Sequence, residues 1–147
     1  MAVTAGRYLE QTALSLRPAS VVLADASLRF FCRYLVEEHP KTTSFTAVGR
    51  AEIEGYKANL ARRITPQGRL VSPDYRRQRL GMLRTFFDRI IEWDWDDAPP
   101  RCPIFASDLP KPDEPLPPQA LSPGSIRRLH SVDDLALIVG RQSGKIR

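Results

Sequence analysis

Arginine side chains are concentrated in one stretch of this 147-residue chain, and they supply its clearest chemical signal. Between positions 62 and 84 there are seven arginines against one acid, Asp74, which gives the stretch a local net charge of +6. A guanidinium group can donate two parallel hydrogen bonds to a phosphate, or to the O6 and N7 atoms of guanine. The stretch therefore predicts contact with a polyanion, and its arginines are Arg62, Arg63, Arg69, Arg76, Arg77, Arg79 and Arg84.

An acidic stretch follows the basic one. Positions 92 to 114 hold seven acids against Arg101 and Lys111, a local net charge of −5, whereas the whole chain has a formal net charge of +5. This order predicts one surface that attracts phosphates and another that repels them. The same residues allow an alternative, in which the arginines form a solvated face with local ion pairs, such as Arg84 with Asp88 four positions later.

Other residues that could carry chemistry are sparse. Cys32 and Cys102 lie 70 positions apart and show no CxxC or Cys/His ligand spacing, so we expect no disulfide framework, no metal site and no cofactor. The first residues do not have the pattern of a secretory signal, and no window reaches the length of a transmembrane segment. We therefore expect a cytoplasmic protein without a membrane partner.

The elements that must position the arginines are predicted to be helices. Four segments show the periodicity of amphipathic helices, and none shows the alternation typical of a strand. They cover about residues 5–16, 20–39, 49–63 and 72–91, separated by short turns and one longer loop from 64 to 71. This pattern predicts an all-α fold, a small four-helix bundle.

Local signals mark where these helices begin. Ser72 is expected to cap the last helix, with Pro73 at its first helical position, and Ser20 is expected to cap the second. Gly49 with Glu52 forms a partial capping box before the third. The residues expected to face the core, including the aromatic Trp93, are Leu9, Ala13, Leu16, Ala24, Leu28, Phe31, Leu35, Ile53, Tyr56, Leu60, Leu80, Leu83, Phe87, Ile91 and Trp93.

One flank of the last helix is predicted to face a ligand. Arg77 and Arg84 are about 20° apart on a helical wheel, on a side that borders the buried stripe. Gly81 lies on the neighbouring flank, where the missing side chain would let a DNA backbone or base edge approach closely. Arg76 is expected to project past the end of the core, and the free amides after Ser72 offer further donors to a phosphate.

Prolines divide the chain into three parts. Eight of its thirteen prolines lie from Pro99 to Pro118, where they favour an extended, semi-rigid backbone. We therefore predict a helical domain over 1–95, an acidic Pro-rich linker over 96–118, and a tail over 119–147. The tail contains five consecutive apolar residues, 135–139, so we expect residues 122–147 to be loosely ordered and to promote self-association.

Three motifs together resemble one known family over about residues 16 to 121. They are LRPAS followed by LRFFCRYL, then SPDYRRQRLGMLRTFFDRIIEWDW, and finally IFASDLPKPDEPLPPQAL. In order and spacing they are similar to the N-terminal core-binding domain of tyrosine recombinases, the phage-type integrases. The resemblance implies a SAM-like four-helix domain that forms one jaw of a clamp around double-stranded DNA. Carried over by position, it implies DNA contact by Ser20, Ser72, Arg76, Arg77 and Arg84.

This chain also departs from the family pattern. Ala24 stands where the family often has an aromatic residue, and Tyr75 and Arg76 replace a more usual threonine and aliphatic pair. The family's active site needs two arginines, a lysine, a His-x-x-Arg signature and a tyrosine nucleophile. His130 is followed by Ser-Val-Asp, and residues 119–147 contain no tyrosine. We therefore expect a truncated recombinase module that is not an enzyme.

A second hypothesis from a different class stays open. The same helical bundle could be a protein-protein interaction module without DNA binding, whose linker and tail dock onto a partner. Salt dependence separates the two, because phosphate contacts release counterions and DNA affinity then falls steeply as salt is added.

Overall fold

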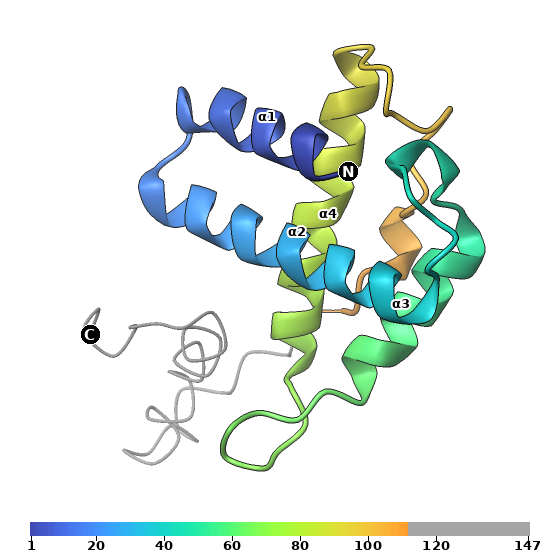
Figure 1. Ribbon diagram of the computed structural model, residues 1–147. Coiled ribbons are helices and arrows are strands. Elements are labelled where there is room, and N and C mark those ends of the chain that lie inside the picture. Colours follow the sequence, from blue (N-terminus) through green and yellow to red (C-terminus); the bar gives the residue numbers. More distant parts are fainter. Residues whose placement is uncertain (112–147) are drawn as a thin grey trace.

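The computed structural model describes residues 1–111, and within them the chain is helical (Figure 1). The four α-helices are α1 (Ala2–Ala13), α2 (Pro18–Glu38), α3 (Arg50–Ala61) and α4 (Pro73–Glu92). Two short 3-10 helices, η1 (Phe45–Ala47) and η2 (Ala106–Asp108), complete the described part, which contains no β-strand. The predicted all-α fold is confirmed for these residues. The predictions for the rest of the linker and for the tail lie outside them.

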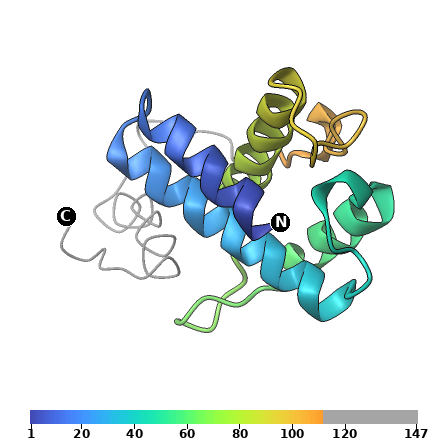
Figure 2. The same ribbon diagram turned by 45° about the horizontal axis from the view of Figure 1, so that its top comes forward.

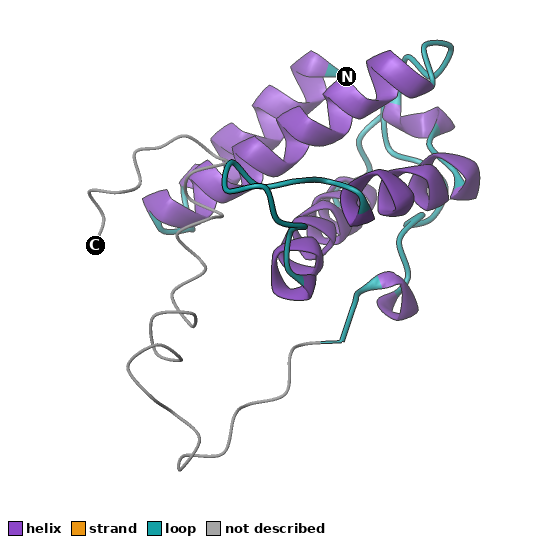
Figure 3. Ribbon diagram, turned by 90° about the horizontal axis from the view of Figure 1, so that it is seen from below, coloured by secondary structure: helices purple, strands orange, loops and turns teal. Residues whose placement is uncertain are grey.

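Helix α2 is the central element of the bundle. It contacts α1, α3 and α4, and it is the longest helix of residues 1–111 at 21 residues. Helices α1 and α2 lie side by side as a hairpin that crosses α4, while α3 lies near the C-terminal end of α2 (Figures 1 and 2). A view from below shows that the long loop between α3 and α4 passes outside the helices (Figure 3).

Helices α3 and α4 begin where the sequence predicted. The Ser72 hydroxyl oxygen accepts a hydrogen bond of 3.0 Å from the Tyr75 amide, and Pro73 is the first helical residue of α4. Before α3, the Glu52 carboxylate accepts a 2.9 Å hydrogen bond from the Gly49 amide, which is the half of a capping box that a glycine permits.

The predicted start of α2 at Ser20 was wrong. The helix begins at Pro18, and Arg17, with extended backbone angles, occupies the N-cap position. Proline suits the first helical position because its φ is already fixed near the helical value. The amide proton that it lacks would have no hydrogen-bond partner there. The sequence interpretation used Pro18 only as the end of the preceding helix, although α1 had already ended at Ala13.

The core is built largely from aromatic side chains. Phe31, Phe45, Phe86 and Phe87 are fully buried, and their rings meet edge to face at centroid distances of 4.9 to 6.2 Å. Most of the predicted stripe residues of α2, α3 and α4 are buried as expected. The stripe predicted for the first helix was wrong, because Ala13 and Leu16 are exposed and α1 buries Tyr8 and Thr12 instead. Two expectations at the end of α4 were wrong, because Ile90 rather than Ile91 is buried and Trp93 is 37% exposed.

The helical unit extends past the predicted boundary at residue 95. Ile104 belongs to the core cluster with 1% exposure, and the Asp97 carboxylate accepts hydrogen bonds from Thr4 Oγ1 at 2.7 Å and from the Phe45 amide at 2.9 Å. The segment from 96 to 111 therefore packs on the bundle instead of leaving it as a linker. Prolines allow this path because they prevent a helix without preventing burial, and Pro99 and Pro103 are both buried.

Candidate nucleic-acid interface

One end of the bundle collects most of the arginines of the basic stretch. The end of α3, the loop that follows it and the start of α4 lie together at the lower end of Figure 1. We call this end the basic pole and define it by Arg62, Arg63, Arg69, Arg76 and Arg77.

The loop of the basic pole is a tight hairpin. Ile64 and Leu70 form an isolated antiparallel bridge, and the Thr65 amide donates to the Arg69 carbonyl. Gly68 supplies the turn with a φ of 83°, a conformation that residues with a Cβ rarely adopt. Because the hairpin is held by its own backbone bonds, it fixes the distance between the end of α3 and the start of α4.

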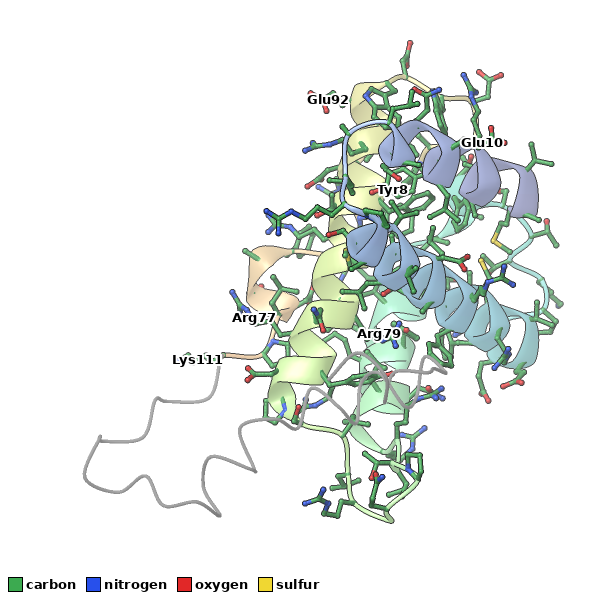
Figure 4. The ribbon with its side chains drawn as sticks, turned by 90° about the vertical axis from the view of Figure 1, so that its left-hand side faces the viewer. Tyr8, Glu10, Arg77, Arg79, Glu92 and Lys111 are labelled. Carbon is green, nitrogen blue, oxygen red and sulfur yellow. The ribbon has the colours of Figure 1, made fainter. Side chains whose placement is uncertain are left out.

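The charges along α4 run in the same sense as its helix dipole. Arg76 and Arg77 lie near the N-terminus of the helix, where free amides already give a partial positive charge, and the acids Glu92, Asp94 and Asp96 follow at its other end (Figure 4). Asp74 in the first turn and Arg89 in the last turn offset this only in part. Over a helix of about 30 Å, side chains and dipole therefore add to a field that attracts an anion to the basic pole.

Asp94 directly follows the C-cap of α4 and adds a further acid at this end of the helix. It adopts a left-handed conformation with a φ of 58°, and the Trp95 amide donates to the Ile90 carbonyl across it. This is the position of a helix C-terminus at which glycine is usual. An acid there adds both backbone strain and a negative charge beside the negative end of the helix dipole.

Arg76, Arg77 and Gly81 lie on accessible parts of α4. Arg77 is exposed, and its Nη1 donates a 2.8 Å hydrogen bond to the Pro110 carbonyl. Arg76 is half-buried, and the space around Gly81 is open: apart from the adjacent residues and the backbone of the helix itself, no heavy atom lies within 4 Å of the position that a Cβ would occupy. The open flank that the sequence predicted at Gly81 is therefore present.

Arg84 lies on the same side of α4 as Arg77, next to the segment that returns from the end of the helix. It is half-buried, and Cys102 Sγ lies 3.9 Å from its backbone carbonyl oxygen. The returning chain therefore borders both predicted contact residues, at Cys102 and at Pro110. The ion pair of Arg84 with Asp88, the alternative drawn from sequence, does not form within 4.0 Å.

Ser20 is not brought to the basic pole. It lies in the first turn of α2, at the left edge of Figure 1, whereas the first turn of α4 with Ser72 is at the lower end. Of the five residues predicted to contact DNA, Ser72, Arg76 and Arg77 therefore lie together, Arg84 follows along α4, and Ser20 lies elsewhere.

Arg79 is a residue whose role the sequence interpretation missed. It was counted with the basic stretch, yet it is fully buried on the side of α4 that faces α2 and α3 (Figure 4). Its Nη1 donates a 3.3 Å hydrogen bond to Ser27 Oγ on α2. Helical spacing could have revealed it, because Arg79 lies four and seven positions before the buried residues Leu83 and Phe86.

Aromatic rings surround the buried charge of Arg79. Its Cζ lies 4.8 Å from the ring centroid of Phe30 and 4.9 Å from that of Tyr75, and Arg63 lies 4.6 Å from the same Phe30 ring. Burial lowers the pKa of Arg79, and the Tyr75 hydroxyl offsets this only partly, without a hydrogen bond of good geometry. Cation-π contacts contribute up to about 2 kcal/mol each, whereas burying an unpaired charge costs several kcal/mol.

A second charged cluster holds the returning segment to α3. Asp108, buried in η2, accepts hydrogen bonds from Arg50 Nη1 and Lys57 Nζ, both at 2.8 Å, and from the Phe105 amide at 2.7 Å. The Arg50 guanidinium, followed by Lys57 and the amide, holds the pKa of the Asp108 carboxyl well below its usual range. Because the charges of this cluster are paired with one another, we assign it a structural role, which is to hold η2 against α3.

The two cysteines of the described part are free but are not activated thiols. Burial raises the pKa of Cys102 to about 11 and also raises that of Cys32, so neither thiol is a ready thiolate. Within residues 1–111, no group of three or more His, Cys, Asp or Glu side chains is placed to hold a metal ion. No helix among these residues is long and apolar enough to cross a membrane.

Comparisons with protein-family models, curated proteins and solved structures gave no match to this chain. The case for a function therefore depends on the basic pole itself, and the resemblance to recombinases stays a hypothesis.

Proposed function

We propose that this chain is a DNA-binding module that contacts backbone phosphates through its basic pole. The observation that carries the proposal is the sum of charges at that pole, where the arginines of α4 reinforce the positive end of the helix dipole instead of compensating its negative end. The accessible Arg76 and Arg77 and the open flank at Gly81 support the same interpretation.

The motif resemblance suggests a more specific role for this module. As the core-binding module of a tyrosine recombinase, it would hold one side of DNA at a site of recombination or integration, as one jaw of the clamp. Arg77 and Arg84 would contact phosphates along one flank of α4, and Arg76 and the Ser72 end of the helix would contact the next phosphates along the strand. This role is part of the proposal.

The first test measures the salt dependence of DNA binding. Fluorescence anisotropy with a labelled duplex should show affinity falling by about 10³ to 10⁵ between 50 and 200 mM salt if 6 to 10 phosphates are contacted. The double substitution Arg77→Ala with Arg84→Ala should weaken binding and reduce the log-log salt slope by about 2, roughly 1 for each phosphate that an arginine no longer neutralises. Circular dichroism should stay helical, because both side chains border the core without filling it.

The control is Arg89→Ala, which removes the same type of side chain from the other end of α4, where Arg89 pairs with Glu92 at 3.3 Å. We expect its binding curve and salt slope to match those of the parent. If the Arg77/Arg84 variant binds like the parent, the basic pole is not the contact surface. Binding to a partner protein that persists at high salt, with none to DNA, would favour the interaction-module hypothesis instead.

We also propose that the module does not cleave or join DNA by itself. The sequence lacks the tyrosine nucleophile and the His-x-x-Arg signature of the family it resembles, and such chemistry needs a nucleophile with charge-stabilising partners. Incubation with supercoiled plasmid should leave the plasmid topology unchanged. A covalent protein-DNA adduct would refute this prediction.

A further inference from the structure

The hairpin between α3 and α4 turns two large apolar side chains outward. Ile64 and Leu70 face each other across its isolated antiparallel bridge, and they are 54% and 62% exposed. Residues opposite one another in an antiparallel pair lie on the same face, and successive residues alternate between faces. The neighbours Thr65 and Val71 are both buried. The hairpin therefore buries a threonine and leaves an isoleucine and a leucine in solvent, which is the reverse of what folding alone would favour.

The backbone of the hairpin holds this apolar pair in place. Beside the bridge, the Thr65 amide donates a 2.6 Å hydrogen bond to the Arg69 carbonyl. The tip is a turn in which the Gly68 amide donates to the Thr65 carbonyl at 2.9 Å, and Pro66 lies at the turn position that its fixed φ suits. A ligand would therefore meet Ile64 and Leu70 in one fixed arrangement.

Positive charge surrounds the apolar pair. Arg62 precedes the hairpin and Arg69 lies within it, and both side chains are exposed. Arg62 forms no ion pair with a carboxylate of residues 1–111. The hairpin projects beyond the helices at the basic pole (Figure 1). A second copy of this chain would bring the same charges against this face, so charge complementarity favours a polyanion as the partner.

The major groove of DNA matches this combination of charge and apolar surface. A two-stranded ribbon fits its width of about 12 Å, whereas the minor groove is only about 6 Å wide. Thymine presents its C5 methyl group in the major groove, where apolar side chains contact it, and adenine presents N6 and N7, to which a glutamine can form two hydrogen bonds. The exposed tip residue Gln67 supplies such an amide, and the arginines supply contacts to phosphates.

We propose that this hairpin enters the major groove of DNA, where Ile64 and Leu70 pack on thymine methyl groups and Gln67 contacts an adenine beside them. The inference rests on the proposed DNA-binding function. It adds a preference for A·T pairs, which phosphate contacts cannot provide because phosphates carry no direct sequence information. The basic pole would hold the backbone while the hairpin contacts the bases.

The test compares two duplexes that differ only in the thymine methyl groups. One is an alternating A·T duplex, and the other has the same sequence with uracil in place of thymine. Fluorescence anisotropy at fixed salt should show that the parent chain binds the thymine duplex about 4- to 15-fold more tightly, because one or two buried methyl groups contribute about 0.8 kcal/mol each and every 1.4 kcal/mol is tenfold. The double substitution Ile64→Ser with Leu70→Ser should remove this preference and keep the salt slope, because the arginines are unchanged.

The control is Val3→Ser with Val36→Ser, which makes the same kind of change at exposed apolar side chains of α1 and α2. It should keep the preference of the parent. All four substituted side chains are more than half exposed, so circular dichroism and the thermal midpoint should show both double variants folded. Gln67→Ala, at the exposed tip, gives a second measurement and should reduce the preference for A·T over G·C duplexes.

The outcomes separate this inference from the proposal on which it rests. Equal binding of the thymine and uracil duplexes by the parent, with a steep salt dependence, would overturn the role of the hairpin and leave the basic pole as a phosphate-binding surface. No binding to either duplex would overturn both proposals. Self-association that the Ile64/Leu70 variant abolishes in light scattering, without any methyl preference, would assign the apolar pair to an interface between two copies instead.

Discussion

At the scale of single residues, Asp108 and Arg79 show two ways in which this fold holds a buried charge. Asp108 is surrounded by donors of opposite charge, Arg50 and Lys57. Arg79 has aromatic rings, one hydroxyl and no acid around it. The buried charge of Asp108 is therefore compensated by opposite charges, whereas that of Arg79 is compensated only by aromatic rings and one hydroxyl.

Asp108→Asn should destabilise the chain at neutral pH by about 1.5–3 kcal/mol, the range for hydrogen bonds to charged groups. The pKa of Asp108 is lowered in the folded state by Arg50, then by Lys57 and the Phe105 amide. The carboxylate therefore contributes stability that is fully present above the unfolded pKa, about 3.9, and is lost as the pH falls below it toward the folded pKa. Urea unfolding of parent and variant from pH 7 to pH 2 measures the difference.

Asp96→Asn is the control for this experiment. It lies in the same segment, and its side chain is exposed. We expect its stability to follow that of the parent within about 0.5 kcal/mol, the usual range for surface substitutions. A difference between parent and Asp108→Asn that does not shrink in acid would show that Asp108 acts by packing and not through its charge.

At the scale of elements, only one of the two serines expected to cap a helix does so. Ser72 caps α4 through the Tyr75 amide, whereas Ser20 lies inside the first turn of α2 behind Arg17 and Pro18. Ser72→Ala should cost about 1 kcal/mol, which lowers the thermal midpoint by roughly 4 °C. Ser20→Ala should leave the midpoint nearly unchanged, since alanine is a good helix former. Equal losses in the two variants would contradict the assignment.

Helix periodicity predicted the buried faces of α2, α3 and α4 well, because their buried residues recur at helical spacing, but it placed the first helix and its buried face wrongly. Leu80, Leu83 and Phe87 are buried as their spacing indicates, and the Ser72-Pro73 pair gave the start of α4 directly. Arg79 has the same helical spacing as the buried Leu83 and Phe86, but its charge favoured a surface position in the interpretation of the sequence. Its partners Phe30 and Ser27 on α2 could not be predicted, because contacts between two helices are not visible in the periodicity of either one.

The sequence also placed most of the candidate site but not its surroundings. Ser72, Arg76, Arg77 and Gly81 belong to one helix, so local spacing was enough to bring them together. Ser20 was placed by resemblance across two helices, and the structure does not join it to the others. The return of the chain beside Arg77 and Arg84 could not be predicted either, because proline-rich composition indicates an extended backbone without saying what it packs against.

At the scale of the whole molecule, the charges of the bundle are separated along one helix axis. The basic pole lies at one end of α4, and the acids that follow Glu92 lie at the other (Figures 1 and 4). A duplex that approaches the chain would therefore be oriented before contact, with the acidic end turned away.

The end of the folded unit is a property of the whole molecule, and it can be tested by truncation. A chain that stops after residue 111 keeps Ile104 in the core, Asp108 on Arg50 and the Pro110 carbonyl on Arg77. We expect it to retain the helical circular dichroism and the cooperative unfolding of the full chain.

A chain that stops after residue 95, the boundary suggested by the prolines, has none of these three interactions. It would also leave the Phe45 amide without its acceptor, the Asp97 carboxylate. Removing Ile104 alone exposes core surface equivalent to about 2–5 kcal/mol, a large share of the 5–15 kcal/mol that stabilises an ordinary domain. Urea midpoints of the two truncated chains should therefore differ clearly. Equal midpoints would mean that residues 96–111 contribute little to the free energy of unfolding despite their contacts. The folded unit would then end near residue 95, as the sequence predicted.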